Sequence, residues 1–166
     1  GSSSGASILG VKFAGDLLCP GGDRVPETRI STLMDTEVMT CALDDIGWLM
    51  TEVPGLSTNV IRETQACVAR SVDWFHLRGR QTAVERIAGL IAIFSERQGQ
   101  PETVSLLLSR QDLGQLTALS FETVSRTIKA LERDGIIDLP SPSRVVGDHA
   151  RLLHLTGTGA LVPRAA

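Results

Sequence analysis

The sequence lacks the features that mark a secreted, membrane-spanning or metal-binding protein. Its three cysteines are separated by 22 and 26 residues, which suits neither a disulfide framework nor a C-x-x-C metal site. No apolar run approaches the roughly 18 residues of a membrane-spanning helix, and the N-terminus does not read as a signal peptide. We therefore expect a cytoplasmic protein in a reducing compartment, without a membrane partner.

An excess of positive charge is also absent. Sixteen Lys and Arg face nineteen Asp and Glu, for a net charge of -3, so any binding to nucleic acid must depend on a local basic patch. The sequence shows no nucleophile-base pair, no metal-ligand spacing and no phosphate-binding loop, so we do not expect an enzyme, a metal or another cofactor. At 166 residues and 42% apolar composition, the chain is long enough for one ordinary domain or two small ones.

Three blocks follow one another along the chain, and they predict an α+β fold. Residues 1–43 contain short alternating runs ("ILGVKFAG", "TRISTLM", "TEVMTCAL") broken by turn residues, which is typical of β-structure. Residues 44–80 have helical periodicity and predict a short helix followed by a long one. Residues 81–166 begin with a third helix and continue into short helices and strand-like runs.

The predicted long helix has an apolar seam. Ile61, Val68 and Phe75 are seven residues apart, and Gln65 and Val72 follow the first two by four, so the seam has one polar interruption. This spacing suits a helix that faces its own core, and it equally suits a helix that pairs with the same helix of a second copy.

The stretch "SRQDLGQLTALSFETVSRTIKALERDG" predicts two short helices joined by a tight turn. Ser109 and Asp112 have the spacing of a capping box, Ser120 can cap the second helix, and Gly135 can end it. The following "GIIDLPSPSRVVGDHARLLHLTG" alternates strand-like runs with turns and predicts a hairpin. Together they indicate a helix-turn-helix with a wing.

The second of these helices has two different sides at about 100° per residue. Val124, Ile128 and Leu131 share a side that should be buried. The opposite side carries Glu122, Ser125, Arg126 and Lys129, with Phe121 at the boundary. Arginine can bond guanine O6 and N7, and glutamate can accept a hydrogen bond from cytosine N4, so this side suits base recognition. A solvated helix face on which Glu122 and Arg126 pair with each other explains the same pattern.

These residues resemble a known family. The stretch from 109 to 137 is similar, without a gap, to the winged helix-turn-helix of the Crp/Fnr family of bacterial transcription regulators. Upstream, "VPGLSTNVIRETQACVARSVDWF" resembles its dimerisation helix and "ILGVKFAGDLLCP" the later strands of its cyclic-nucleotide-binding-like β-roll. The resemblance implies a partial N-terminal β-roll, a long dimerisation helix and a C-terminal winged helix-turn-helix, with further strands before Ile8 in family members.

The resemblance also assigns roles to individual residues. Glu122, Ser125 and Arg126 match the E-x-x-S-R pattern of the FixK and Fnr branch, which implies base reading of a TTGA-type half-site. The residues implied to contact phosphates or support the reader are Ser109, Gln111, Ser120, Phe121, Thr123 and Lys129, and those implied at the dimer interface are Ile61, Val68, Val72 and Phe75. Ala118 replaces the usual glycine of the turn, so we expect a slightly altered turn.

Ligand sites of the family have weak counterparts here. Gly15 and Asp16 correspond to the Gly-Glu pair of the nucleotide pocket, but Pro26 and Glu27 stand where an Arg-Ser pair would hold the phosphate. Cys41 resembles one ligand of an iron-sulfur cluster whose other ligands have no counterpart, so we expect neither cofactor.

The resemblance implies a homodimeric regulator that binds palindromic double-stranded DNA. It also implies activation through contact with RNA polymerase, often of genes for low-oxygen metabolism. Two alternatives remain: a regulator of the same architecture gated by a small-molecule or redox effector, and an interaction module that uses the exposed helix face to bind protein.

Overall fold

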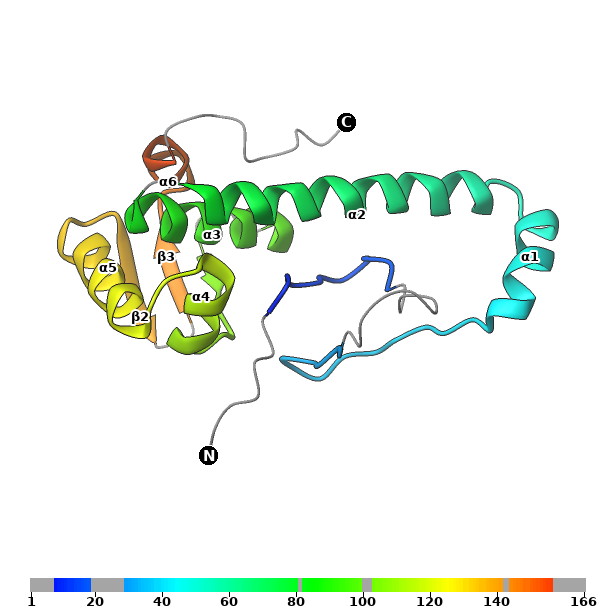
Figure 1. Ribbon diagram of the computed structural model, residues 1–166, viewed down its shortest axis with the longest axis horizontal. Coiled ribbons are helices and arrows are strands. Elements are labelled where there is room, and N and C mark those ends of the chain that lie inside the picture. The colour runs from blue at the N-terminus through cyan, green and yellow to red at the C-terminus, as the bar shows by residue number, and fades with distance from the viewer. Residues whose placement is uncertain (1–7, 19–28, 81, 100–102, 142–143, 157–166) are drawn as a thin grey trace. The chain divides into compact units, whose positions relative to one another are not determined.

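The computed structural model describes residues 8–18, 29–80, 82–99, 103–141 and 144–156 (Figure 1). The chain divides into two compact units. One combines Gly1–Phe13 with Ser71–Ala166, and the other is Ala14–Arg70. This division falls within the long helix, whereas the predicted boundaries after residues 43 and 80 stay a prediction.

The Ala14–Arg70 unit contains α1 (Leu43–Glu52) and the first part of α2 (Leu56–Gly79). Asp44 and Asp45 lie in the first turn of α1, where carboxylates interact favourably with the helix dipole. Gly55 adopts a positive φ of 80° between the two helices, a conformation that glycine reaches without steric cost. The predicted short and long helices are therefore confirmed.

The described part of the segment expected to be β-structure forms no strand. Residues 8–18 and 29–42 contain turns and extended chain without ladder hydrogen bonds. Alternating apolar and polar residues favour a strand only when a neighbouring strand supplies backbone partners. The α+β class, the long helix and the winged unit are confirmed, while the partial β-roll is not formed by the described residues.

The unit that contains Ser71–Ala166 begins with the end of α2 and continues with α3 (Ala83–Gln98), β1 (Thr103–Ser105), α4 (Arg110–Thr117) and α5 (Phe121–Arg133). It ends with β2 (Ile137–Ser141), β3 (Arg144–Gly147) and α6 (His149–Leu155). The three strands form an antiparallel sheet in the order β1-β3-β2, with Val104 opposite Val145 and Ile137 opposite Gly147. The predicted hairpin is thus β2 and β3, and β1 extends it to three strands.

The end of the predicted hairpin stretch is a helix rather than a strand. Asp148 accepts hydrogen bonds from the backbone N–H groups of Ala150 and Arg151, at 2.8 and 3.3 Å, and so caps α6. Leu152 on this helix is buried against the core. The strand-like interpretation of "ARLLHL" was wrong because an N-cap aspartate and packing of Leu152 and Leu155 on the core favour a short helix over an unpaired strand.

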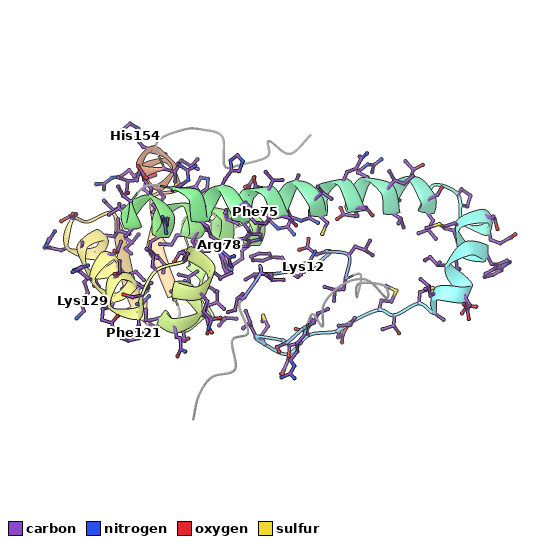
Figure 2. All side chains as sticks on the ribbon, in the orientation of Figure 1. Lys12, Phe75, Arg78, Phe121, Lys129 and His154 are labelled. Carbon is purple, nitrogen blue, oxygen red and sulfur yellow. The ribbon has the colours of Figure 1, made fainter. Side chains whose placement is uncertain are left out.

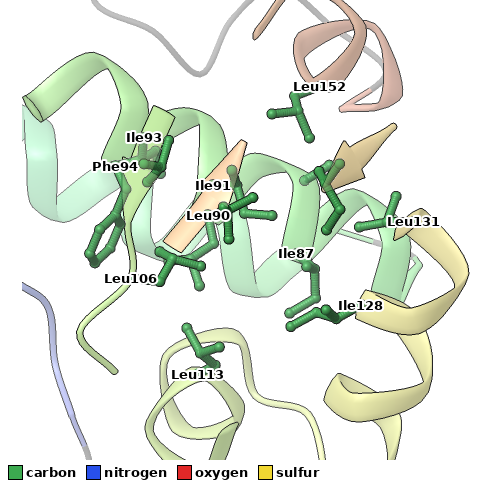
Figure 3. Close-up of a cluster of buried hydrophobic side chains, with 14 of the residues drawn as sticks. Ile87, Leu90, Ile91, Ile93, Phe94, Leu106, Leu113, Ile128, Leu131 and Leu152 are labelled. Atoms are coloured by element: carbon green, nitrogen blue, oxygen red, sulfur yellow. The ribbon is translucent and has the colours of Figure 1, made fainter. Parts of the chain in front are cut away.

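The core of this unit is built around α3 (Figure 3). Every residue from Ile87 to Ser95 is buried, which few helices of a small domain achieve. Leu113 of α4, Ile128 and Leu131 of α5, and Leu152 of α6 belong to the same cluster. Each such side chain contributes about 1.5–3 kcal/mol by leaving water. Both helices of the helix-turn-helix are thereby fixed to one central helix.

The segment Ile8–Phe13 belongs to the same unit. Ile8, Val11 and Phe13 pack against its core. The rings of Phe13 and Phe94 meet edge to face with centroids 5.1 Å apart, and the guanidinium of Arg97 lies 5.3 Å from the Phe13 centroid. A segment distant in sequence therefore contributes to the packing of α3.

No helix within the described ranges is long and apolar enough to cross a membrane.

Candidate nucleic-acid interface

The first helix of the motif begins where the sequence predicts. The Ser109 hydroxyl accepts a hydrogen bond from the Asp112 N–H at 3.1 Å, and the Asp112 carboxylate accepts one from the Ser109 N–H at 3.0 Å. This reciprocal pair is the predicted capping box, and it satisfies two backbone donors at the start of α4.

The turn between α4 and α5 retains left-handed backbone geometry. Ala118 adopts φ 55° and ψ 45°, and it has the only positive φ of a non-glycine residue in the described chain. This conformation costs an alanine about 1 kcal/mol, since its Cβ approaches the backbone. Arg86 donates hydrogen bonds to the Thr117 and Ala118 carbonyls at this turn. The expected slight alteration of the turn stays a prediction.

The second helix has the two sides that its periodicity predicts. The Ser120 hydroxyl caps α5 by accepting from the Thr123 N–H at 3.2 Å. Val124, Ile128 and Leu131 are buried in the core. Thr127 is buried beside them and was not predicted, although it lies three residues after Val124.

The opposite side of α5 forms a shallow groove, here called the α5 groove. It is lined by Glu122, Ser125, Arg126, Lys129, Ala130 and Arg133. Figure 2 shows Phe121 and Lys129 on the outer side of the same helix. The structure thus brings together the four polar residues predicted for this face.

Arg133 was missed by the sequence reasoning. It follows Glu122 by eleven residues, which is close to three helical turns, so the same angular calculation would have placed it on this face. Its side chain is 76% exposed and its Nε donates to the Asp134 carboxylate at 3.0 Å. The groove therefore carries three cationic side chains, of Arg126, Lys129 and Arg133, and one anionic side chain, of Glu122.

The surroundings of Glu122 favour its ionised carboxylate, which accepts hydrogen bonds. Its pKa is lowered first by a hydrogen bond from its own backbone N–H and second by the Ser120 hydroxyl. Within the described residues, no ion pair joins Glu122 to Arg126. The structure does not show the mutual pairing that would explain these two residues as a self-satisfied helix face, so both remain available to a partner.

The predicted phosphate-contacting residues lie around the same motif. Phe121 is the first residue of α5 and is 55% exposed. Gln111 is exposed on α4, and Thr123 is half-buried on α5. The hydroxyls of Ser109 and Ser120 are already used in helix caps, although both residues are exposed. Their contacts with phosphate stay a prediction.

The residues predicted at a dimer interface form an exposed line on α2, here called the α2 stripe. Ile61, Val68, Val72 and Phe75 have exposed fractions of 59%, 61%, 45% and 73%. On the opposite side of the helix, Leu77 is buried and Trp74 is half-buried. The seam is thus exposed on the described chain, and its role as a dimer interface stays a prediction.

The counterparts of the family's ligand sites lie only partly within the described residues. The Asp16 carboxylate, only 3% exposed, lies 3.4 Å from the Arg70 guanidinium, and that guanidinium is 3.2 Å from Glu63. Pro26 and Glu27 lie outside the described residues, as does Cys19. Among the residues that the structure describes, no three potential metal ligands gather, and Cys41 is exposed.

The elements from α3 to α6 define a winged helix-turn-helix whose reader helix presents a polar groove. Comparison with known proteins agrees. Residues 85–155 match the Crp-like helix-turn-helix domain. The chain is 36% identical over 118 residues to the transcriptional activator protein FnrL of Cereibacter sphaeroides, covering 66% of this chain and 48% of FnrL.

Two further comparisons point to the same branch. The nitrogen fixation regulation protein FixK of Azorhizobium caulinodans is 39% identical over 82 residues, covering 46% of this chain and 33% of that protein. The structure of FixK2 from Bradyrhizobium japonicum superposes with a TM-score of 0.63 at 25% identity, covering 70% of this chain and 60% of that one. The chain belongs to the Crp/Fnr family and resembles its FixK/Fnr branch. It spans about half the length of FnrL and a third of that FixK protein.

Proposed function

We propose that this protein is a transcription regulator that binds palindromic DNA with TTGA-type half-sites as a homodimer, without a nucleotide or iron-sulfur cofactor. The observation that carries the proposal is the α5 groove. It combines one carboxylate and three cations on the exposed side of a helix whose other side is fixed in the core. A helix held in this way can enter a major groove as a rigid body.

Each side chain of the groove has a definite chemical role in this proposal. Arg126 presents two parallel donors to guanine O6 and N7, and Glu122 accepts from the amino group of cytosine or adenine. Ser125 lies between them on the same face. Lys129 and Arg133, farther along α5, interact with phosphates and supply affinity that does not depend on sequence.

The charge distribution explains how an acidic protein can bind DNA. The net charge of -3 gives no general attraction to a polyanion. The α5 groove concentrates positive charge where the helix would meet the duplex, so binding depends on a few contacts and should be sensitive to salt.

The α2 stripe supplies the second half of the proposal. Four large apolar side chains exposed along one line of a helix favour burial against an identical line. A two-fold pair of long helices would place the two reader helices about 34–36 Å apart, the repeat of B-DNA, and would explain a palindromic operator.

The test is fluorescence anisotropy of labelled duplexes without any effector. One duplex carries TTGAT and ATCAA half-sites and the other a scrambled sequence, each at two salt concentrations. We expect the chain to prefer the first duplex. Arg126→Ala should lose about 1–3 kcal/mol of that preference for each half-site, or roughly 5- to 150-fold per half-site, while binding the scrambled duplex almost as well.

Arg29→Ala is the matched control, because it removes an exposed arginine that lies outside the α5 groove. It should behave as the unsubstituted chain. If Arg126→Ala binds both duplexes as tightly as the unsubstituted chain, the groove is a surface for protein instead. A preference that appears only after an effector is added would indicate a gated regulator.

A further inference from the structure

The carbonyl groups at the end of α4 have an unusual set of partners. A helix leaves its last four carbonyls without partners inside the helix. The Gly114 carbonyl accepts from the N–H groups of Ala118 and Leu119. The next four carbonyls, of Gln115, Leu116, Thr117 and Ala118, all accept from arginine side chains.

Two arginines divide these four carbonyls between them. Arg78 donates from Nε to the Leu116 carbonyl at 3.0 Å and from Nη2 to the Gln115 carbonyl at 3.3 Å. Arg86 donates from Nη1 to the carbonyls of Thr117 and Ala118, at 3.2 and 3.3 Å. Positive charge at the C-terminal end of a helix is also favourable because of the helix dipole.

Each arginine belongs to a helix other than α4 and also donates to a backbone carbonyl outside α4. Arg78 lies in the last turn of α2 and also donates to the Ile8 carbonyl (Figure 2). Arg86 lies in the first turns of α3, and its Nε donates to the Arg80 carbonyl at 2.8 Å. The guanidinium groups therefore connect the end of α4 to α2 and to α3, and a lysine could not reproduce these forked contacts.

The turn that Arg86 contacts is the strained one. Ala118 has left-handed geometry without the freedom of glycine. Its neighbour Leu119 is so close to α4 that a Cβ on Gly114 would lie 2.6 Å from the Leu119 carbonyl oxygen. The orientation of α5 depends on this turn, because α5 begins at Phe121, three residues after Ala118.

We propose that Arg78 and Arg86 are positioning residues for base recognition. They hold the end of α4 and the Ala118 turn, and so fix the angle at which α5 presents Glu122 and Arg126, without touching DNA themselves. The inference depends on the proposed function. It assigns sequence preference to two residues that lie outside the α5 groove.

The experiment measures the ratio of affinities for the TTGAT and scrambled duplexes in Arg78→Gln, Arg86→Gln and Ala118→Gly chains, and in the Arg86→Gln/Ala118→Gly double variant. We expect the ratio of the two affinities to fall by at least roughly fivefold in both glutamine variants. Fivefold is the low end of the discrimination that one bidentate base contact supplies. Affinity for the scrambled duplex should change little. The Ala118→Gly substitution should restore most of the ratio in the Arg86→Gln background, since glycine adopts this conformation without support.

Three outcomes would overturn the inference: an unchanged ratio in either glutamine variant, equal losses on both duplexes, or no restoration by Ala118→Gly. If Arg86→Gln does not fold, as judged by circular dichroism, Arg86→Lys takes its place. Its affinity ratio, measured with and without Ala118→Gly, is judged by the same three outcomes. A preference in the unsubstituted chain that survives in Arg86→Gln contradicts this inference alone. A lack of preference in the unsubstituted chain contradicts the proposed function, and this inference with it.

Discussion

At the scale of single residues, the proposed function assigns affinity and sequence preference to different residues of the α5 groove. In the proposed function Arg126 and Glu122 contact bases, whereas Lys129 and Arg133, which lie one and two turns farther along the helix, contact phosphates. A cation that neutralises one phosphate changes binding to all sequences alike, because the phosphate backbone carries no base information.

Lys129→Ala should therefore weaken binding to the specific and the scrambled duplex by the same factor. The slope of log affinity against log salt should become less negative by about 1.8, because a dimer that carries the substitution in both copies neutralises two phosphates fewer, at about 0.9 each. Arg133→Ala should do the same. Anisotropy titrations at four salt concentrations measure both quantities, with Arg29→Ala again as control. A selective loss on the specific duplex would place either residue on a base instead.

At the scale of elements, the helix-turn-helix is a tightly packed unit in which the backbone of the turn lies close to the backbone of α4. The N–H of Leu119 bonds the Gly114 carbonyl at 2.9 Å, and this approach leaves no room for a side chain on Gly114. Glycine serves here to allow close approach, because its φ is an ordinary helical one.

Gly114→Ala should destabilise the unit by about 1–3 kcal/mol, since the new methyl group must displace the turn. Gly79→Ala is the control, because nothing lies within 4 Å of a Cβ at that position. Thermal unfolding followed by circular dichroism compares the two. Equal stability of both variants would mean that the turn has more freedom than its geometry indicates.

A second property at this scale is the pH dependence of two partly buried carboxylates, Asp73 on α2 and Glu96 on α3. Burial raises the pKa of Asp73 above its usual 3.8, and the nearby His76 offsets part of that effect. Burial also raises the pKa of Glu96 above its usual 4.5, with Arg97 opposing the shift and Asp73 adding to it. The folded state therefore binds protons more tightly than the unfolded state at both sites.

A raised carboxyl pKa contributes stability that is present at low pH and is lost as pH rises through the folded value. The Asp73→Asn/Glu96→Gln variant should thus gain stability relative to the unsubstituted chain as pH increases from about 4 towards 7. Urea unfolding at several pH values measures the difference. Asn59→Gln, which changes an exposed side chain on α2 without removing a titratable group, should show no such trend. A constant difference across the range would contradict the role of burial.

At the scale of the whole molecule, the exposed α2 stripe requires an explanation that the single chain does not supply. Phe75 and Val68 are among its most exposed large apolar side chains in the described ranges, although they lie on a regular helix. Burial against a second copy would remove four such side chains per chain from water.

Val68→Glu should shift the chain from dimer to monomer in sedimentation velocity, because it places a charge in the centre of the α2 stripe. The same variant should bind a palindrome no more tightly than a single half-site. The advantage of the palindrome depends on two α5 helices that are linked in one dimer. Asn59→Glu, an exposed substitution on the other side of α2, should leave both unchanged. A Val68→Glu chain that remains dimeric would exclude the α2 stripe as the interface.

Much of the reader could be predicted from local sequence. Both helices begin at a cap that depends only on contacts within four residues, and these caps are confirmed. They join Ser109 to Asp112 and Ser120 to Thr123. The buried side of α5 follows from helical periodicity alone. The position of Arg133 follows from the same periodicity, although it was not predicted. The helix α6 was misread because Asp148 acts as a cap only when the following residues can pack on the core.

The sequence by itself determined the elements whose causes are local: helix caps, the two-sided α5, the long α2 with its apolar stripe, and the resemblance to the Crp/Fnr family. The tertiary structure alone decided three other features. It left the described part of residues 8–42 without strands, because ladders need partners that periodicity cannot supply. It placed the α2 stripe in solvent. It brought Arg78 and Arg86 to the carbonyls of a turn more than thirty residues away, since long-range hydrogen bonds depend on how helices pack and not on the order of residues.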